Sequence, residues 1–82
     1  MHYVYLLQSQ SNDRQRYVGM TADLKARIIE HNAGKSSHTS KFRPWTLVTY
    51  IAFSDQPQAA AFERYLKSGS GHAFANKRLW KT

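Results

Sequence analysis

The hydrophobic residues fall into short runs separated by polar segments, a pattern typical of a small domain that mixes strands and helices. Residues 3–7 and 16–20 are rich in aromatic and β-branched side chains, which predicts two strands. Residues 9–15 between them contain no hydrophobic side chain, so the two strands are expected to form a hairpin around a polar loop. Gly19 lies inside the second strand and indicates either a bulge or a close approach of another group to the backbone.

A helix is predicted directly after this hairpin. Leu24 and Ile28 recur at helical spacing, and Thr21 is expected to cap the start of the helix. Residues 32–34 (Asn-Ala-Gly) are expected to end it, because glycine accepts the backbone conformation that commonly follows a helix. Residues 35–43 are polar and basic, which predicts a loop.

A third strand and two further helices are predicted in the rest of the chain. Residues 46–53 are rich in Val, Ile, Thr and Tyr, which favours a strand. Residues 54–55 (Ser-Asp) offer a helix cap, and the helix is expected to run to Leu66. Residues 67–71 contain two glycines and are expected to stop this helix, and residues 72–80 to form a short last helix.

The predicted order of elements is therefore β-β-α-β-α-α. The hairpin loop is too short for the crossover that parallel strands need, so the three strands are expected to pair antiparallel. Helices are expected to flank this small sheet, which gives an α+β fold. Without an internal repeat, a low-complexity tract or a linker, residues 1–82 are expected to form one domain.

The charge balance points to a negatively charged partner. Twelve Lys and Arg residues stand against five Asp and Glu, which gives a formal net charge of +7 and a pI near 10.1. Such an excess on a small protein favours nucleic acid, because binding releases counterions from the phosphates. A membrane surface is less favoured, since no segment combines a basic face with a wide apolar stripe.

Several classes of protein are excluded by what the sequence lacks. The chain has no cysteine, which excludes disulfides, thiolate metal sites and a cysteine nucleophile. Its four histidines lack the spacing of zinc ligands. No apolar run approaches the roughly 20 residues that a membrane-spanning helix needs. Residues 1–8 become polar too early for a signal peptide, so a cytoplasmic protein is expected.

Basic side chains are concentrated in the predicted loop 35–43 and after the second helix. They are candidates for contacts with phosphates, and the alternative is that they are scattered charges in solvent. The candidates for binding nucleic acid are Lys35, His38, Lys41, Arg43 and Lys67.

Motifs at four places along the chain resemble those of the GIY-YIG nuclease superfamily. They are residues 3–5 (Tyr-Val-Tyr), residues 17–19 (Tyr-Val-Gly), the predicted helix with Arg27, and residues 62–67 (Phe-Glu-Arg-Tyr-Leu-Lys) with Glu63. In order and spacing they are most similar to the small, single-domain bacterial UPF0213 or YhbQ-like group, over essentially the whole chain.

The resemblance implies an enzyme, a divalent-metal-dependent endonuclease that hydrolyses phosphodiester bonds in DNA, with structure-selective cleavage in repair or recombination as one form of it. Arg27 would stabilise charge on the phosphate, and Glu63 would hold Mg²⁺ or Mn²⁺, since one carboxylate with several waters suits Mg²⁺. One tyrosine would position or deprotonate water and the other would contact the phosphate, in an order left open. The residues that the resemblance implies as catalytic are Tyr5, Tyr17, Arg27 and His31.

The sequence departs from the family pattern at three positions. Tyr3 replaces the first glycine of the family's name, Val18 replaces isoleucine, and Asn76 alone is available as the family's late asparagine. Other interpretations therefore stay open at this stage. Strand tyrosines commonly pack in a core, and Glu63 with Lys67 has the spacing of an exposed ion pair. The alternative functions are a nucleic-acid-binding module without catalysis and, less favoured, a protein-interaction module; DNA or RNA as partner and the oligomeric state are left open.

Overall fold

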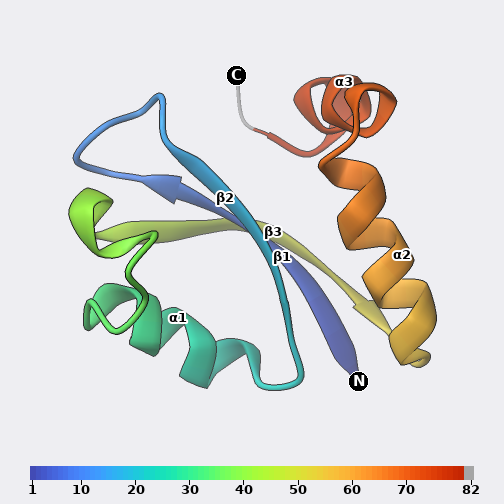
Figure 1. Ribbon diagram of the computed structural model, residues 1–82, viewed down its shortest axis with the longest axis horizontal. Helices are drawn as coiled ribbons and strands as arrows, with labels where there is room; N and C mark the ends of the chain where they lie inside the picture. Colours follow the sequence, from blue (N-terminus) through green and yellow to red (C-terminus); the bar gives the residue numbers. More distant parts are fainter. Residues whose placement is uncertain (81–82) are drawn as a thin grey trace.

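The computed structural model describes residues 1–80, and it confirms the predicted order of strands and helices. Within that part of the chain, every helix is too short or too polar to cross a membrane. The elements are β1 (His2–Ser9), β2 (Arg16–Thr21), α1 (Leu24–Asn32), the 3₁₀ turn η1 (Ser40–Phe42), β3 (Trp45–Phe53), α2 (Gln56–Leu66) and α3 (Gly69–Arg78), shown in Figure 1.

The three strands form an open antiparallel sheet in the order β2-β1-β3. The first strand is therefore central, and its residue Tyr5 faces Gly19 on β2 and Tyr50 on β3. The register between β1 and β3 shifts between Leu6 and Leu7, while the pairing of β1 with β2 is continuous. The sheet thus places one tyrosine at its centre, next to the glycine of the second motif.

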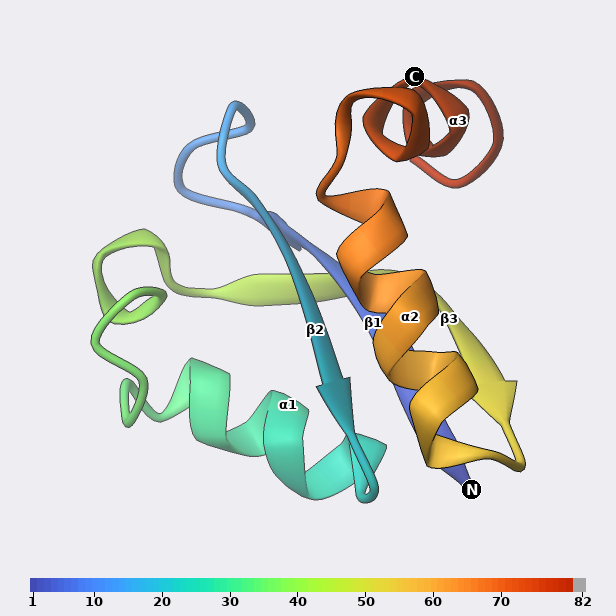
Figure 2. The same cartoon turned by 45° about the vertical axis from the view of Figure 1, so that its right-hand side comes forward.

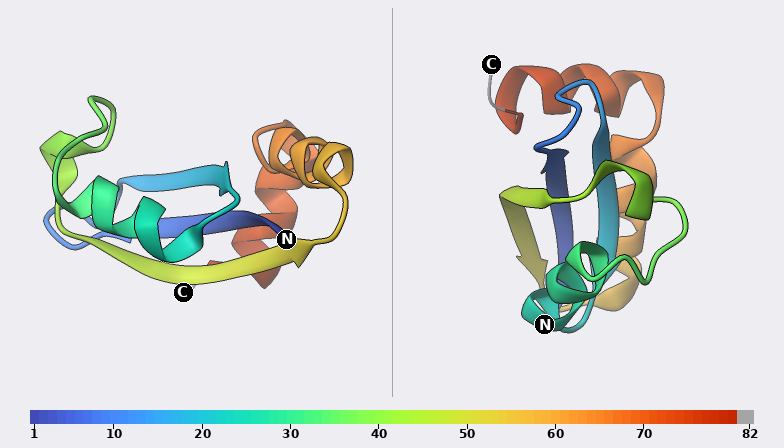
Figure 3. Two further views of the ribbon diagram at one scale, coloured as in Figure 1. Left: turned by 90° about the horizontal axis from the view of Figure 1, so that it is seen from below. Right: turned by 90° about the vertical axis from the view of Figure 1, so that its left-hand side faces the viewer.

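Successive residues of β1 contribute to two different cores, because side chains alternate between the faces of a strand. Val4 and Leu6 pack with residues of α2 and α3 on one face. Tyr5 and Leu7 pack with Trp45 on the other face, against residues of α1. Figure 2 shows α1 and α2 on either side of β2, and Figure 3 shows how the sheet curves between them. The face that carries Tyr5 is the face covered by α1.

The structure corrects the predicted start of the first helix. Asp23, and not Thr21, is its N-cap, and the Asp23 carboxylate accepts a hydrogen bond from the Ala26 N–H at 3.1 Å. The Thr21 hydroxyl instead accepts from the Asp23 N–H, at 3.1 Å. The predicted end is confirmed: α1 ends at Asn32, and Gly34 follows with φ +79°, a left-handed conformation that suits glycine.

Residues 67–71 were predicted to separate the last two helices, and this prediction is wrong for the two glycines, which lie inside α3. The second helix ends at Leu66, and Gly69 already opens α3, where the Ser68 hydroxyl caps the helix by accepting from the Gly71 N–H. A Cβ at Gly71 would overlap the carbonyl oxygen of Tyr65. Gly71 is therefore a packing residue, which lets α3 turn sharply against the end of α2 (Figure 1).

Candidate active site

The four residues expected to be catalytic come together on the sheet face covered by α1. Tyr5 lies on β1, Tyr17 on β2, and Arg27 and His31 on α1. The ring of Tyr17 lies 6.2 Å from that of Tyr5 and 5.0 Å from that of His31, measured between centroids. Positions 27 and 31 are one helical turn apart, so both side chains reach the same strands. We call these four residues the tyrosine cluster.

Gly19 explains how the cluster fits over the sheet. A Cβ at this position would lie 2.6 Å from Cζ of Tyr5 and 2.9 Å from Cε2 of Tyr17. Real Cβ atoms do not approach other carbons so closely, so the two rings need a glycine beneath them. The predicted close approach at Gly19 is thereby confirmed, and the approaching groups are the tyrosines themselves.

Arg27 joins the cluster through one edge of its guanidinium. Its Nε donates to Oη of Tyr5 at 3.4 Å, and Nη1 donates to Oε1 of Glu30 at 3.0 Å. The Arg27 side chain is 40% exposed, so part of the guanidinium still faces solvent. The ion pair with Glu30 is also exposed, and such pairs contribute about 0–1 kcal/mol to stability. Arg27 is thus held in place and remains open to a ligand.

A buried chain of hydrogen bonds runs from Tyr5 to the loop after α1. Oη of Tyr5 lies 2.9 Å from Nε2 of His31, and Nδ1 of His31 lies 2.8 Å from Oγ1 of Thr39. Each of these three residues is 1% exposed. The Trp45 indole N–H donates to the Thr39 carbonyl at 2.8 Å, which fixes the position of the loop.

The proton of a neutral His31 sets the direction of both of its hydrogen bonds. With this proton on Nδ1, the Tyr5 hydroxyl donates to Nε2, and Oγ1 of Thr39 accepts from Nδ1. With this proton on Nε2, His31 donates to Oη of Tyr5, and the Thr39 hydroxyl donates to Nδ1. In both arrangements the Arg27 guanidinium donates to Oη of Tyr5.

The surroundings shift two ionisation equilibria in the cluster. Burial raises the pKa of Tyr5 above its usual value, and the hydrogen bond from Arg27 opposes this shift. Burial lowers the pKa of His31 below its usual value, and the positive charge of Arg27 lowers it further. At neutral pH, Tyr5 is therefore protonated and His31 is neutral. A neutral histidine has one ring nitrogen that accepts, so His31 is able to take up a proton.

Glu63 lies on α2, and its carboxylate contributes to raising the pKa of Tyr5. Its side chain is 23% exposed, and Oε2 accepts from Nζ of Lys67 at 3.1 Å, the ion pair expected from their spacing. Within residues 1–80, no three His, Asp or Glu side chains gather into a metal cage. A single carboxylate still fits Mg²⁺, which is often held by one or two carboxylates, waters and the phosphates of a substrate.

The basic residues predicted to bind nucleic acid lie in two separate places. The loop after α1 reaches the cluster through Thr39, but its basic side chains are exposed. Arg43 packs against Gly34, and its Nε donates to the Ser40 carbonyl at 2.9 Å. Lys67 is distant in sequence and caps the end of α2, next to Glu63. The residues of the loop group are Lys35, His38, Lys41 and Arg43.

Asn76, the one available late asparagine, lies on α3 and bonds to a residue outside the tyrosine cluster. Its Oδ1 accepts from Nη1 of Arg16 at 3.2 Å. Sequence reasoning also missed Thr39, since a threonine in a polar loop gives no periodic signal. Thr39 follows His31 by eight residues, and the turn between α1 and η1 brings the two side chains together.

Comparisons with known proteins agree with the geometry. The protein-family model described as the GIY-YIG catalytic domain matches residues 1–78 of this chain. A UPF0213 protein of Staphylococcus haemolyticus is 39% identical over 70 residues, which cover 84% of this chain and 83% of that protein. A UPF0213 protein of the archaeon Haloquadratum walsbyi is 35% identical over 68 residues, which cover 82% of this chain and 74% of that protein.

A solved structure shows the same fold. The solution NMR structure of a UPF0213 protein from Bacillus halodurans matches with a TM-score of 0.56 and 32% identity, covering 93% of this chain and 82% of that one. The resemblance inferred from the short motifs is thereby confirmed over most of the chain. This chain belongs to the GIY-YIG family, a nuclease-type family.

Proposed function

We propose that this protein is a divalent-metal-dependent endonuclease that hydrolyses phosphodiester bonds in DNA. The observation that carries the proposal is the tyrosine cluster, in which Arg27 and His31 both contact the hydroxyl of Tyr5. A titratable group whose pKa is shifted by burial and by a specific charged partner is a candidate for a functional site. Membership of a nuclease-type family supports the same reaction.

Arg27 is suited to hold the phosphate. A phosphodiester under attack gains negative charge on its non-bridging oxygens, and a fixed guanidinium stabilises that charge. The bonds from Arg27 to Tyr5 and Glu30 fix the guanidinium, and its solvent-facing edge is free to meet the phosphate. The cost of orienting this group is therefore met before substrate binds.

Tyr5 is suited to pass on a proton from the attacking water. As Oη takes up the proton of the water, the proton that Oη already carries moves to Nε2 of neutral His31, 2.9 Å away. Arg27 donates to the same oxygen and stabilises negative charge there. Tyr17 has no hydrogen-bond partner for its hydroxyl among the described residues and is half-buried. We therefore assign Tyr5 to the water and Tyr17 to the phosphate.

Glu63 would hold the metal ion, Mg²⁺ or Mn²⁺. When bound, the ion supplies positive charge beside the leaving oxygen and lowers the pKa of a bound water. The Glu63 side chain presents Oε1 for this role, since Oε2 is bonded to Lys67. A selective action on branched or flapped DNA, as in repair or recombination, is part of the proposal and is tested with the same substrates.

The direct test is cleavage of end-labelled duplex, flapped and four-way DNA with Mg²⁺, with Mn²⁺ or with EDTA. We expect metal-dependent products from the wild type and a loss of about 10²–10³-fold in Arg27→Ala. Lys25→Ala is the matched control, because Lys25 lies on the same helix and is exposed. Salt-dependent binding without cleavage of any substrate contradicts the proposal and favours a binding module that has lost catalysis.

A further inference from the structure

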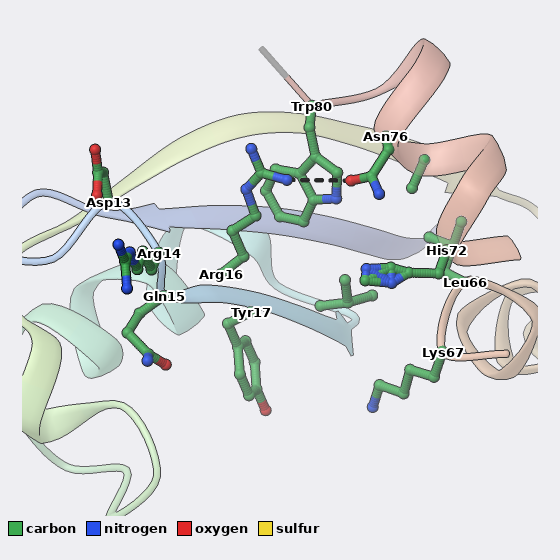
Figure 4. A pocket seen from close by; sticks show the side chains of 12 residues that line it. Asp13, Arg14, Gln15, Arg16, Tyr17, Leu66, Lys67, His72, Asn76 and Trp80 are labelled. Carbon is green, nitrogen blue, oxygen red and sulfur yellow. Dashed lines mark hydrogen bonds between the residues drawn. The ribbon is translucent and has the colours of Figure 1, made fainter. Parts of the chain in front are cut away.

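A second recess lies beside the tyrosine cluster, between β2 and the junction of α2 with α3 (Figure 4). Its volume is about 770 Å³, within the range of roughly 300–1,000 Å³ that is typical of ligand-binding pockets. Trp80 closes one end, and Leu66 forms part of its apolar surface. We call this recess the β2–α3 cavity.

Basic side chains line both walls of the β2–α3 cavity. Arg14 and Arg16 come from β2 and the loop before it, and Lys67 and His72 come from the helical side. Figure 4 shows His72 and Lys67 extending from the helices toward β2. Asp13 is the single acidic residue of the lining. The electrostatics therefore favour an anion between the two walls.

Arg16 is held in the cavity by neutral groups. Its Nε donates to Oε1 of Gln8 at 3.0 Å, and its Nη1 donates to Oδ1 of Asn76. Its guanidinium lies 4.7 Å from the centre of the Trp80 ring. None of these partners carries a negative charge, so the full positive charge of Arg16 remains available to a ligand. The guanidinium covers a face of the Trp80 ring, which holds it in place as a donor group for a phosphate.

Tyr17 belongs to both places. Its ring packs against Tyr5 and His31 in the tyrosine cluster, and Tyr17 also lines the β2–α3 cavity. Lys67 has the same double position, since it lines the cavity and bonds to Glu63. A strand whose phosphate lies against the cluster therefore meets the cavity with its next nucleotide.

We propose that the β2–α3 cavity binds the nucleotide that adjoins the scissile phosphate. Lys67, His72 and Arg16 hold its phosphate, beside the Trp80 ring that Arg16 covers. The proposal rests on the proposed function, because the cluster defines where the scissile phosphate lies. It adds a specificity site, since a strand that ends at the scissile phosphate leaves this cavity empty and binds less tightly.

The first test is an NMR titration of ¹⁵N-labelled wild-type protein with a short oligodeoxythymidylate in EDTA, so that binding is measured without cleavage. The two tryptophan indole signals report on two places. Trp80 lines the cavity, whereas the indole N–H of Trp45 is bonded to the Thr39 carbonyl and serves as an internal reference. We expect the Trp80 signal to shift strongly and the Trp45 signal weakly. Binding that leaves the Trp80 signal in place overturns the proposal.

The second test uses variants and the same oligonucleotide. Trp80→Leu is expected to weaken binding about two- to fivefold, because it removes the ring that holds Arg16. Lys67→Ala is expected to lower the slope of log K against log salt by about 0.7, the effect of one phosphate contact on a single strand. Lys77→Ala removes the same charge from α3 outside the cavity and is expected to bind like the wild type. Lys67 is exposed, so its variant is expected to fold whether or not Trp80→Leu does.

The outcomes separate this proposal from the proposed function. If the Trp80 signal of the wild-type protein shifts but no substrate is cleaved, the result supports the proposed role of the cavity and contradicts the proposed nuclease activity. A wild-type protein that cleaves, with Lys67→Ala and Lys77→Ala binding equally well at every salt concentration, contradicts the cavity alone.

Discussion

Glu63→Gln is expected to abolish metal-dependent cleavage, with a loss of about 10³-fold or more, which corresponds to about 4 kcal/mol of transition-state stabilisation. Glutamine keeps the size of the side chain but removes the negative charge that would hold a cation. Folding is expected to change little, because the lost pair with Lys67 is exposed and such pairs contribute about 0.3–0.5 kcal/mol. Cleavage is measured with Mg²⁺ on the best DNA substrate, and folding by urea denaturation.

Glu30→Gln is the matched control for this experiment. Glu30 is the other glutamate of the chain, and it pairs with Arg27 on the exposed side of α1. Its substitution is expected to reduce cleavage by less than about threefold, since the amide oxygen of glutamine still accepts from Arg27 and the lost charge is exposed. Equal losses in both variants would show a general effect of charge. Full activity in Glu63→Gln would place the metal ion elsewhere.

Gly19→Ala is expected to reduce both stability and cleavage. The new Cβ would lie 2.6 Å from Cζ of Tyr5, so the ring must move away from Arg27 and His31 or the strand must shift. Overpacking of this kind costs about 1–3 kcal/mol of stability. Displacing the Tyr5 hydroxyl is expected to reduce cleavage by about 10²-fold or more, since small misplacements at a reacting group are costly. Urea denaturation and cleavage assays measure the two effects.

Gly69→Ala serves as the control for Gly19→Ala. Among residues 1–80, no atom beyond the neighbouring residues and the helix's own backbone lies within 4 Å of a Cβ at Gly69, and this residue opens α3. Alanine favours a helix over glycine by about 0.5–1 kcal/mol, so this variant is expected to keep its stability or gain some and to cleave normally. Normal cleavage by Gly19→Ala would contradict the placement of Tyr5 in the reaction.

The sequence predicts the strands and helices well because each has a clear periodic pattern or cap. Its error at Gly69 and Gly71 has a physical cause. Glycine in a sequence signals either a break or a close approach of two backbones, and only the packing of α3 against Tyr65 separates the two. The same ambiguity at Gly19 was resolved by the rings above it.

The residues of the candidate site that belong to sequence motifs could be predicted, whereas those that depend on tertiary contacts could not. Tyr5, Arg27 and His31 lie on regular elements at informative spacings, and the structure brings them together. Thr39 lies in a loop, and the role of Arg16 depends on α3 coming close to β2. Neither contact has a signature in the chain, because both join segments that are placed by the core rather than by local propensity.

The two cores of the sheet differ in the polarity of the side chains that they bury. The core under α2 and α3 consists of apolar side chains such as Val4 and Leu6, whereas the core under α1 encloses the polar atoms of His31 and Thr39. A protein optimised for stability alone would fill that second space with leucine or phenylalanine. Selection for higher thermal stability is therefore expected to replace the polar residues buried under α1, and activity is expected to fall as a result. Engineering for robustness is better directed at the α2–α3 side, where substitutions leave the chemistry in place.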